Sequence, residues 1–324
     1  MKIIKSDNIL VTGGAGFIGS NIIRRLNKMG IGSRITVCDR LNEKSQRNLV
    51  GLKFHSIVSP ERVFNLPAYG PDIIIHMGAT SSTNAGFSEC FENNYEFSKE
   101  LFCFAKGNPF IYASSAATYA NGQCDDTIPL KDLRPKSNYA ISKHFFDQYV
   151  ENCSNCLGLK FFNVFGPGEW AKGDMASYIL NQTLRAIREK KQLSVYEVGV
   201  RTNICRDFVP IDYAIDKMFA LVEKDARGLF NIGTGCELSF TYVAQIIAVE
   251  LGRIARTKVD VLTDKKDPSF FGNGYQYYTK SVNEKIDSVI GGGNLSCGDT
   301  TELIEQSIRD YVGYILRNYK YYLD

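Results

Sequence analysis

The chain has 324 residues, of which 44% are hydrophobic and 23% charged, and its formal net charge is +3. This length predicts one large or two interleaved domains with a sizeable core. The small net charge does not favour nucleic acid or a membrane surface as a partner, although it suits an anionic small molecule. Neither a signal peptide nor an apolar run of roughly 20 residues is visible, so we expect a cytoplasmic protein.

Nine cysteines and three histidines are scattered along the chain without the spacing of a disulfide framework. An odd number of cysteines in this arrangement is typical of free thiols in a reducing compartment. Cys153 and Cys156 form a C-x-x-C motif, which could be redox-active or half of a zinc site, but no second pair follows it. We therefore expect no metal site.

The first half of the chain alternates short apolar runs with amphipathic helices. A helix is predicted over Gly19–Met29, and strands are predicted over Asn8–Thr12, Arg34–Cys38, Asp72–His76 and Phe110–Ala113. Continuous apolar strands separated by helices indicate a parallel sheet covered on both faces, with right-handed crossovers. The predicted fold class is therefore α/β, with a doubly wound parallel sheet of the Rossmann type.

The pattern changes after a further predicted strand, Lys160–Phe165. The sequence Gly166-Pro167-Gly168 ends that strand, and the alternation of strands and helices then becomes irregular. This change indicates a second, smaller lobe built from the C-terminal half of the chain. The first predicted domain comprises residues 1–166 and about 208–235, and the second comprises about 167–207 and 236–324.

A glycine-rich loop joins the first predicted strand to the first helix. It reads Thr12-Gly-Gly-Ala-Gly-Phe-Ile-Gly19 and has the spacing G-x-x-G-x-x-G. Such glycines permit a tight turn, let the backbone approach a pyrophosphate and pack the helix on the strand. The N-terminus of the helix offers unpaired N–H groups to the phosphates. Because Asp39 ends the second strand, where a ribose-binding acid belongs, the sequence predicts a dinucleotide site.

The residues around Asp39 leave the choice of dinucleotide open. Asp39 suits the free ribose hydroxyls of NAD, whereas Arg40, followed by Lys44 and Arg47, could offset the charge of a 2′-phosphate. An ordinary solvated loop would also explain these basic residues. On balance the sequence favours NADP, with NAD as the alternative.

The sequence Tyr139-Ala-Ile-Ser-Lys143 presents two functional side chains on one face of a predicted helix. A tyrosine is a poor base at neutral pH, but a neighbouring ammonium group stabilises its phenolate. Ser114 and Ser115 follow the fourth strand, so a serine hydroxyl can lie at its C-terminal end beside a nicotinamide. Together these residues predict proton exchange with a substrate hydroxyl.

The glycine loop, the serine and the Tyr-x-x-x-Lys motif together resemble the extended short-chain dehydrogenase/reductases. Finer motifs resemble the ADP-L-glycero-D-manno-heptose 6-epimerase family within that group, and they include Tyr112–Tyr119, Phe162–Pro167 and the pair Lys172-Gly173 followed by Met175-Ala176-Ser177. The likeness covers most of the chain and is thinnest between Asp39 and Tyr69 and after Gly291. It implies that the first predicted domain binds NAD(P) and that the second is the substrate domain, which holds ADP-heptose or a similar nucleotide sugar. It also implies a homo-oligomer.

The resemblance also implies roles for individual residues. Ser115 is implied to be catalytic because it directly precedes the Ala-Ala-Thr-Tyr segment, together with Tyr139, Lys143 and a second acid/base, Lys172, on the opposite side of the substrate. Cofactor contacts, besides Lys143, are expected for Gly13, Gly16, Phe17, Ile18, Gly19, Asp39, Arg40, Gly78, Ala79, Thr80 and Val164. Substrate contacts are expected for Ser81, Asn93, Asn163, Asp174, Asn181, Arg206 and Tyr275.

The implied reaction is inversion at C6″ of ADP-D-glycero-D-manno-heptose through a 6-keto intermediate, as used in the synthesis of the lipopolysaccharide inner core. Because the nicotinamide stays on one side, a protonating group is needed on each face of the substrate. The chain departs from the family pattern at Gly168, where arginine is common, and at Asp174 and Asn181, where serine and histidine would stand. The alternatives are a UDP-hexose 4-epimerase, which needs no second base at Lys172, and a non-catalytic cofactor-binding protein.

Overall fold

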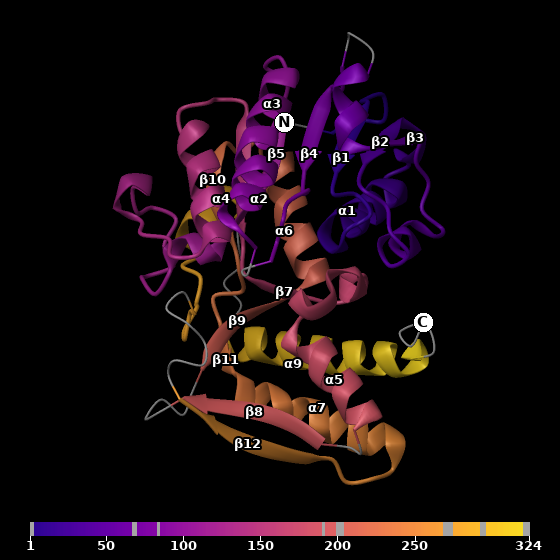
Figure 1. Ribbon diagram of the computed structural model, residues 1–324, viewed down its shortest axis with the longest axis vertical. Helices are drawn as coiled ribbons and strands as arrows, with labels where there is room; N and C mark the ends of the chain where they lie inside the picture. Colours follow the sequence, from indigo (N-terminus) through magenta and orange to yellow (C-terminus); the bar gives the residue numbers. More distant parts are fainter. Residues whose placement is uncertain are drawn as a thin grey trace.

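The structure is a computed structural model that describes residues 3–66, 70–82, 85–189, 192–198, 204–267, 275–291 and 296–319. Its central sheet has seven parallel strands in the order β10-β6-β5-β4-β1-β2-β3 (Figure 1). The strands are β1 (Ile9–Thr12), β2 (Ile35–Cys38), β3 (Ser56–Val58), β4 (Ile73–His76), β5 (Phe110–Ser115), β6 (Cys156–Phe161) and β10 (Gly228–Ile232). The predicted α/β fold with a Rossmann-type parallel sheet is confirmed.

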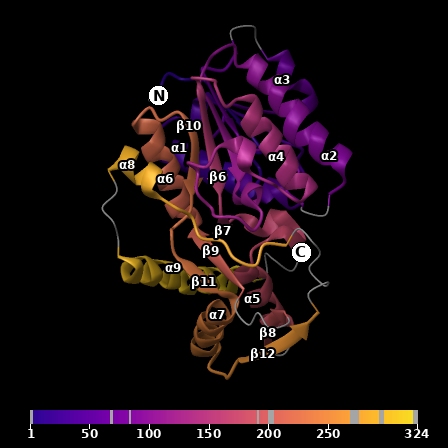
Figure 2. The ribbon, with the colours of Figure 1, turned by 90° about the vertical axis from the view of Figure 1, so that its left-hand side faces the viewer.

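Helices cover both faces of this sheet, as Figures 1 and 2 show. On one face lie α1 (Phe17–Lys28) and α6 (Ile211–Glu223), and on the other lie α2 (Phe87–Phe91), α3 (Phe97–Phe104) and α4 (Asn138–Tyr149). Successive strand residues enter different cores, because side chains alternate between the two faces of a strand. Ile9 and Val11 pack with α1 and α6, whereas Leu10 packs with α3 and α4. This double burial explains the continuous apolar runs in the sequence.

The prediction of one strand over Lys160–Phe165 is wrong. β6 already begins at Cys156 and ends at Phe161, and a separate strand, β7 (Asn163–Phe165), pairs with β9 (Cys205–Pro210) in a second sheet that also contains β11 (Glu237–Ser239). The chain leaves the large sheet at Phe162, whose N–H group donates to the carbonyl oxygen of Ile232 at 3.2 Å. The apolar residues on both sides of this break, Phe161 and Phe162 before Asn163 and Val164 and Phe165 after it, are buried, so hydrophobicity alone does not reveal it.

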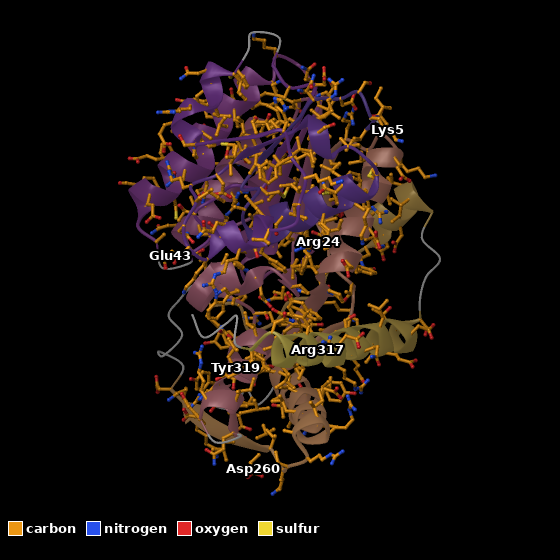
Figure 3. All side chains as sticks on the ribbon, turned by 90° about the vertical axis from the view of Figure 1, so that its right-hand side faces the viewer. Lys5, Arg24, Glu43, Asp260, Arg317 and Tyr319 are labelled. Carbon is orange, nitrogen blue, oxygen red and sulfur yellow. The ribbon has the colours of Figure 1, made fainter. Side chains whose placement is uncertain are left out.

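A second hydrophobic core lies beneath the large sheet in Figure 1. It is built from α5 (Tyr178–Arg188), α7 (Phe240–Ala255) and α9 (Cys297–Arg317), beside the parallel pair β8 (Gln192–Val198) and β12 (Asp260–Lys266). In Figure 3, Asp260 lies at the end of the molecule remote from the large sheet. The short helix α8 (Glu284–Ile290) packs against α6 instead. The separate cores support the predicted division into two domains, which remains a proposal.

Among the described residues, no helix combines the length and the hydrophobicity needed to cross a bilayer. The longest, α9, has 21 residues, but it carries charged residues along its whole length and packs one face against α5 and α7. Its role is therefore to complete the second core.

Candidate active site

A cavity of about 610 Å³ opens at the carboxyl ends of the central strands. Its walls come from the loops after β1, β2 and β4, from the end of β5, from α4 and β7, and from the 3-10 helix η7 (Glu169–Met175). β1 lies between β2 and β4, so the winding of the sheet reverses at this point. Open α/β sheets bind ligands at such a switch point.

The glycine loop after β1 has a shape that only glycine permits. Gly13 has a φ of 64°, and a Cβ atom added there would lie 2.5 Å from the backbone nitrogen of Gly78 in the loop after β4. A Cβ atom added to Gly19 would lie 2.1 Å from the carbonyl oxygen of Gly13. The two loops therefore meet backbone to backbone at the start of α1, whose first turn contains no acidic residue. This cradle fits the pyrophosphate of a dinucleotide.

Asp39 lies against this loop and accepts a hydrogen bond from the N–H group of Ala15 at 2.8 Å. Burial raises the pKa of the Asp39 carboxyl, and the backbone hydrogen bonds oppose that rise. Arg40 instead pairs with Glu61, whose Oε1 lies 2.9 Å from both Nε and Nη2 of the guanidinium. A ribose 2′-phosphate at Arg40 would therefore share this guanidinium with a carboxylate.

Ser115, Tyr139 and Lys143 meet at one wall of the cavity. Ser115 ends β5, and Tyr139 and Lys143 lie one turn apart on α4, which is capped by Ser137. Burial raises the pKa of Tyr139, and its hydrogen bond with Ser115 opposes that rise. Burial lowers the pKa of Lys143 to about 8, and its Nζ donates to the carbonyl oxygen of Ala113 at 2.9 Å. The arrangement can transfer a proton at a substrate hydroxyl.

The two neighbouring serines have different partners. The hydroxyl of Ser114 donates to Oδ2 of Asp147 at 2.8 Å, beneath the cavity. The hydroxyl of Ser115 accepts a hydrogen bond from the N–H group of Ala117 at 3.1 Å and can still donate its own proton. This difference supports the choice of Ser115 over Ser114 as the catalytic residue, which remains a proposal.

Lys172 lines the cavity from η7, so it belongs to a different wall from Tyr139. Its Nζ lies 5.7 Å from the centre of the Phe17 ring at the start of α1. Burial lowers the pKa of Lys172, and the charge of Glu169 opposes that change. Glu169 is fully buried and accepts hydrogen bonds from the N–H and hydroxyl groups of Ser177, at 2.6 and 2.7 Å. These bonds fix the segment that carries Lys172.

Two asparagines connect this segment to the glycine loop. The amide of Asn48 donates to the carbonyl oxygens of Ala15 at 3.0 Å and Gly168 at 2.9 Å. The amide of Asn21, on α1, donates to the carbonyl oxygen of Pro167 at 2.9 Å. The side chain of Asn48 therefore links the backbone just before η7 to the backbone of the glycine loop, and Asn21 links it to α1.

The structure brings most of the predicted site residues to the cavity wall, namely Gly13, Gly16, Phe17, Ile18, Gly19, Asp39, Arg40, Gly78, Ala79, Ser81, Ser115, Tyr139, Lys143, Asn163, Val164 and Lys172. Five predicted residues are not among the lining residues: Thr80, Asn93, Asn181, Arg206 and Tyr275. Asp174 lies in η7, but its side chain is outside the described part of the chain. In that described part, no cluster of His, Cys, Asp or Glu side chains is arranged to hold a metal ion.

Arg206 is buried behind the wall rather than exposed in it. Its guanidinium lies 5.1 Å from the ring centre of Tyr275 and 5.7 Å from that of Phe240, and it donates to the carbonyl oxygen of Gln276. Phe240 and Gln276 do line the cavity, so Arg206 is one side chain away from it. Asn181 is exposed and donates to the carbonyl oxygen of Ala176 at 3.0 Å.

Asn94 is a structural residue of the site that the sequence patterns did not single out. It is fully buried in the π-helical turn Glu92–Glu96. Its side chain exchanges hydrogen bonds with the backbone of Thr80, at 2.8 and 3.0 Å, and donates to the hydroxyl of Ser142 at 3.0 Å. Asn94 therefore holds the loop after β4 against α4. The sequence analysis predicted a role for the adjacent Asn93 instead, because only the register of the π-helix shows which of the two asparagines is buried.

Residues 9–233, more than half of the chain, match the NAD dependent epimerase/dehydratase family. The chain belongs to this family. A relative in Fusobacterium nucleatum, an ADP-L-glycero-D-manno-heptose-6-epimerase, is 33% identical over 334 residues, which cover 94% of this chain and 96% of the relative.

Two solved structures extend the comparison. The Helicobacter pylori ADP-L-glycero-D-manno-heptose-6-epimerase has a TM-score of 0.76 and 26% identity, over 96% of each chain. The Thermotoga maritima UDP-glucose 4-epimerase has a TM-score of 0.77, over 96% of this chain and 99% of that one. Its identity is 22%, so this second likeness concerns the fold alone.

Membership of the epimerase/dehydratase family confirms the predicted resemblance and the predicted enzyme class, an NAD(P)-dependent epimerase. It also supports a nicotinamide dinucleotide as the cofactor. The geometry agrees, because the glycine cradle and Asp39 flank the same cavity as Tyr139 and Lys143. The choice between NAD and NADP remains a prediction, as do the roles of the individual residues.

Proposed function

We propose that the protein is a nucleotide-sugar epimerase that inverts C6″ of ADP-D-glycero-D-manno-heptose, giving the L-glycero epimer. One observation carries this proposal: a single cavity is lined by the glycine cradle, by Tyr139 and, from another wall, by the half-buried side chain of Lys172. The heptose 6-epimerases of Fusobacterium nucleatum and Helicobacter pylori, which are similar over almost the whole chain, support the same substrate.

Inversion at a carbinol carbon requires proton transfer on both faces of the substrate. In the first half-reaction, C6″ loses a hydride and its hydroxyl loses a proton to one of the two groups, Tyr139 or Lys172. The product of that step is a 6-keto sugar. After the ketone turns its other face, C6″ regains the hydride and the second group supplies the proton. The hydride that C6″ loses returns to the same carbon, so the overall reaction is redox-neutral and needs no external oxidant.

A nicotinamide dinucleotide, when bound, would accept the hydride from C6″ and return it. The residues that would hold it are the glycine cradle at the pyrophosphate, Asp39 at a ribose and Lys143 at the nicotinamide ribose. A protonated Lys143 also stabilises the Tyr139 phenolate, and the Ser115 hydroxyl keeps Tyr139 in place. We propose NADP as the dinucleotide because Arg40, although paired with Glu61, lies beside Asp39 at the cavity wall.

The nucleotide sugar would occupy the part of the cavity nearest the second core. Ser81 and Asn163 line the cavity and would offer polar groups to the sugar. Arg206 would contribute as a buried cation near the diphosphate, acting across the thin layer formed by Phe240 and Gln276. A homo-oligomeric assembly, a cytoplasmic location and a role in lipopolysaccharide inner-core synthesis are part of the same proposal.

The deciding experiment is NMR of the anomeric and C6″ signals of ADP-D-glycero-β-D-manno-heptose incubated with the purified protein, without added reductant. Conversion to the L-glycero epimer is the expected result. Unchanged heptose together with conversion of UDP-glucose to UDP-galactose would replace the proposal by a UDP-hexose 4-epimerase. Binding of dinucleotide without turnover of either sugar would favour a non-catalytic protein.

Variants then separate the two proton-transfer groups. Tyr139→Phe and Lys172→Met should each lower turnover by roughly 10²–10⁴-fold, as expected for loss of a general acid or base. The matched control is Lys5→Met, because Lys5 is an exposed lysine on the surface of the molecule (Figure 3). Full turnover of Lys172→Met would remove this lysine from the mechanism and favour the 4-epimerase.

A further inference from the structure

A pair of opposite charges is buried under the catalytic wall of the cavity. Asp147 and Lys160 have side chains that are 0% and 1% exposed, and Nζ of Lys160 lies 3.2 Å from Oδ2 of Asp147. Removing two charges from water is costly, and well-packed hydrophobic residues in their place are often as stable. Stability is therefore a weak explanation for this pair, and its neighbours suggest another.

The Asp147 carboxylate joins α4 to β5. It accepts hydrogen bonds from the Tyr112 hydroxyl at 3.1 Å and from the Ser114 hydroxyl at 2.8 Å. Ser114 directly precedes Ser115, and Asp147 lies one helical turn beyond Lys143. One side chain thus links the helix that bears Tyr139 and Lys143 to the strand that ends in Ser115.

Lys160 reaches Ser115 by a second path. It stands opposite Ser114 in the β5–β6 register, and its Nζ donates to the hydroxyl oxygen of Thr118. The hydroxyl of Thr118 in turn donates to the carbonyl oxygen of Ser115 at 2.8 Å. The next-but-one residue of β6, Gly158, leaves room for this arrangement, because a Cβ atom there would lie 2.6 Å from the Tyr112 hydroxyl.

We propose that Asp147 and Lys160 are positioning residues of the epimerase site. Asp147 fixes Ser115 relative to Tyr139 and supplies the negative charge that favours the protonated form of Lys143, while Lys160 holds that carboxylate and the turn after Ser115 in place. This inference rests on the proposed function, since it assigns Ser115, Tyr139 and Lys143 to the chemistry.

The electrostatic part of the proposal concerns the groups that face Lys143. They are Asp147 on its own helix, the Cys90 thiol of α2 and the His76 imidazole of β4. Burial lowers the pKa of Lys143 to about 8, and the charge of Asp147 opposes that change. Burial also lowers the pKa of His76 to about 3, so His76 is neutral near pH 7. Asp147 is accordingly the carboxylate that favours the ammonium form of Lys143.

The test compares Lys160→Met with the double variant Asp147→Asn/Lys160→Met, because the two differ only in the carboxylate. Dinucleotide binding is measured by NADPH fluorescence between pH 6 and 10, which needs no sugar, and turnover is measured in parallel. The double variant should lose binding and turnover at a pH about one unit lower than Lys160→Met, which is a roughly fivefold loss at pH 8 that approaches tenfold at higher pH. Coincident pH profiles would overturn the electrostatic role.

Two further variants test positioning and remain informative if the double variant does not fold. Asp147→Glu keeps the negative charge but displaces it. We expect kcat to fall at least about tenfold, while KM and the pH at which activity is lost on the alkaline side of the pH profile stay unchanged. Lys160→Arg should restore the kcat that Lys160→Met loses. Unchanged kcat in Asp147→Glu would overturn the proposal. If the pH profile of dinucleotide binding shifts but the protein does not turn over the heptose, the role of Asp147 stands and the proposed substrate is wrong.

Discussion

Gly19 offers a test in which helix propensity and steric contact predict opposite changes in stability for a Gly→Ala substitution. It is a buried residue in the first turn of α1, and a Cβ atom there would lie 2.1 Å from the Gly13 carbonyl oxygen and 2.8 Å from the Cα of Gly14. Both neighbours are backbone atoms of the dinucleotide cradle, so they cannot turn away as a side chain would. Gly298, in the first turn of α9, is exposed, and its nearest atom is the hydroxyl oxygen of Ser296 at 3.5 Å.

The magnitudes follow from these contacts. Propensity alone makes either Gly→Ala change stabilising by about 0.5–1 kcal/mol. At Gly19, overpacking against backbone should cost an amount near the upper end of the usual range of about 1–3 kcal/mol. The net expectation for Gly19→Ala is a loss of roughly 2 kcal/mol, or about 4–8 °C in Tm, whereas Gly298→Ala should gain about 1–4 °C.

The assay is thermal unfolding of both variants without ligand, followed by titration with NADPH. If relief of the strain moves the cradle, the dinucleotide Kd of Gly19→Ala should rise about tenfold, which corresponds to about 1.4 kcal/mol. The Kd of Gly298→Ala should not change. A Gly19→Ala variant with a Tm at or above that of the wild type would refute the steric reasoning. A lower Tm with an unchanged dinucleotide Kd would show that the steric contact destabilises α1 without displacing the cradle.

Three further outcomes are expected. Burial lowers the pKa of His76 to about 3, so below pH 6.5 the imidazole is protonated in the unfolded chain but not in the folded one. The free energy of unfolding should therefore fall by roughly 1.4 kcal/mol per pH unit between pH 6.5 and 3. The variant His76→Gln should flatten this slope, as measured by urea titrations at pH 7 and 5. Glu61→Gln should free Arg40 and tighten NADP several-fold relative to NAD in competition titrations, and equal shifts for both would contradict this. Asn48→Ala removes two hydrogen bonds of about 1 kcal/mol each and should weaken both dinucleotide and sugar binding, whereas the surface control Asn27→Ala, which also loses two backbone hydrogen bonds, should weaken neither.

Local motifs made the dinucleotide half of the site predictable. The glycine loop, Asp39 and the pair Tyr139 and Lys143 act within one turn or one strand-to-helix connection, so spacing in the sequence corresponds to spacing in the fold. The carboxyl ends of parallel strands meet at one edge of the sheet, which brought Ser115 to the same cavity.

Long-range packing made the remainder harder to predict. The break between β6 and β7 is hidden because Phe161 and Phe165 are both buried, but in different cores. The π-helical turn changes which of Asn93 and Asn94 faces inward, and a pattern with 3.6 residues per turn does not contain that information. Arg206 was expected at the substrate, but residues about 30 and 70 positions further along the chain cover it.

The separation between α4 and η7 has an evolutionary consequence. The dinucleotide loop, Ser115, Tyr139 and Lys143 come from the first 150 residues, whereas Lys172 lies in a stretch of seven residues at the passage to the second core. A duplicated gene can therefore acquire a new substrate through changes in this short stretch, while the dinucleotide loop, Ser115, Tyr139 and Lys143 stay unchanged. Exchange of residues 169–175 between relatives would likewise alter the stretch that bears Lys172, the proposed second proton-transfer group, and leave the central sheet intact.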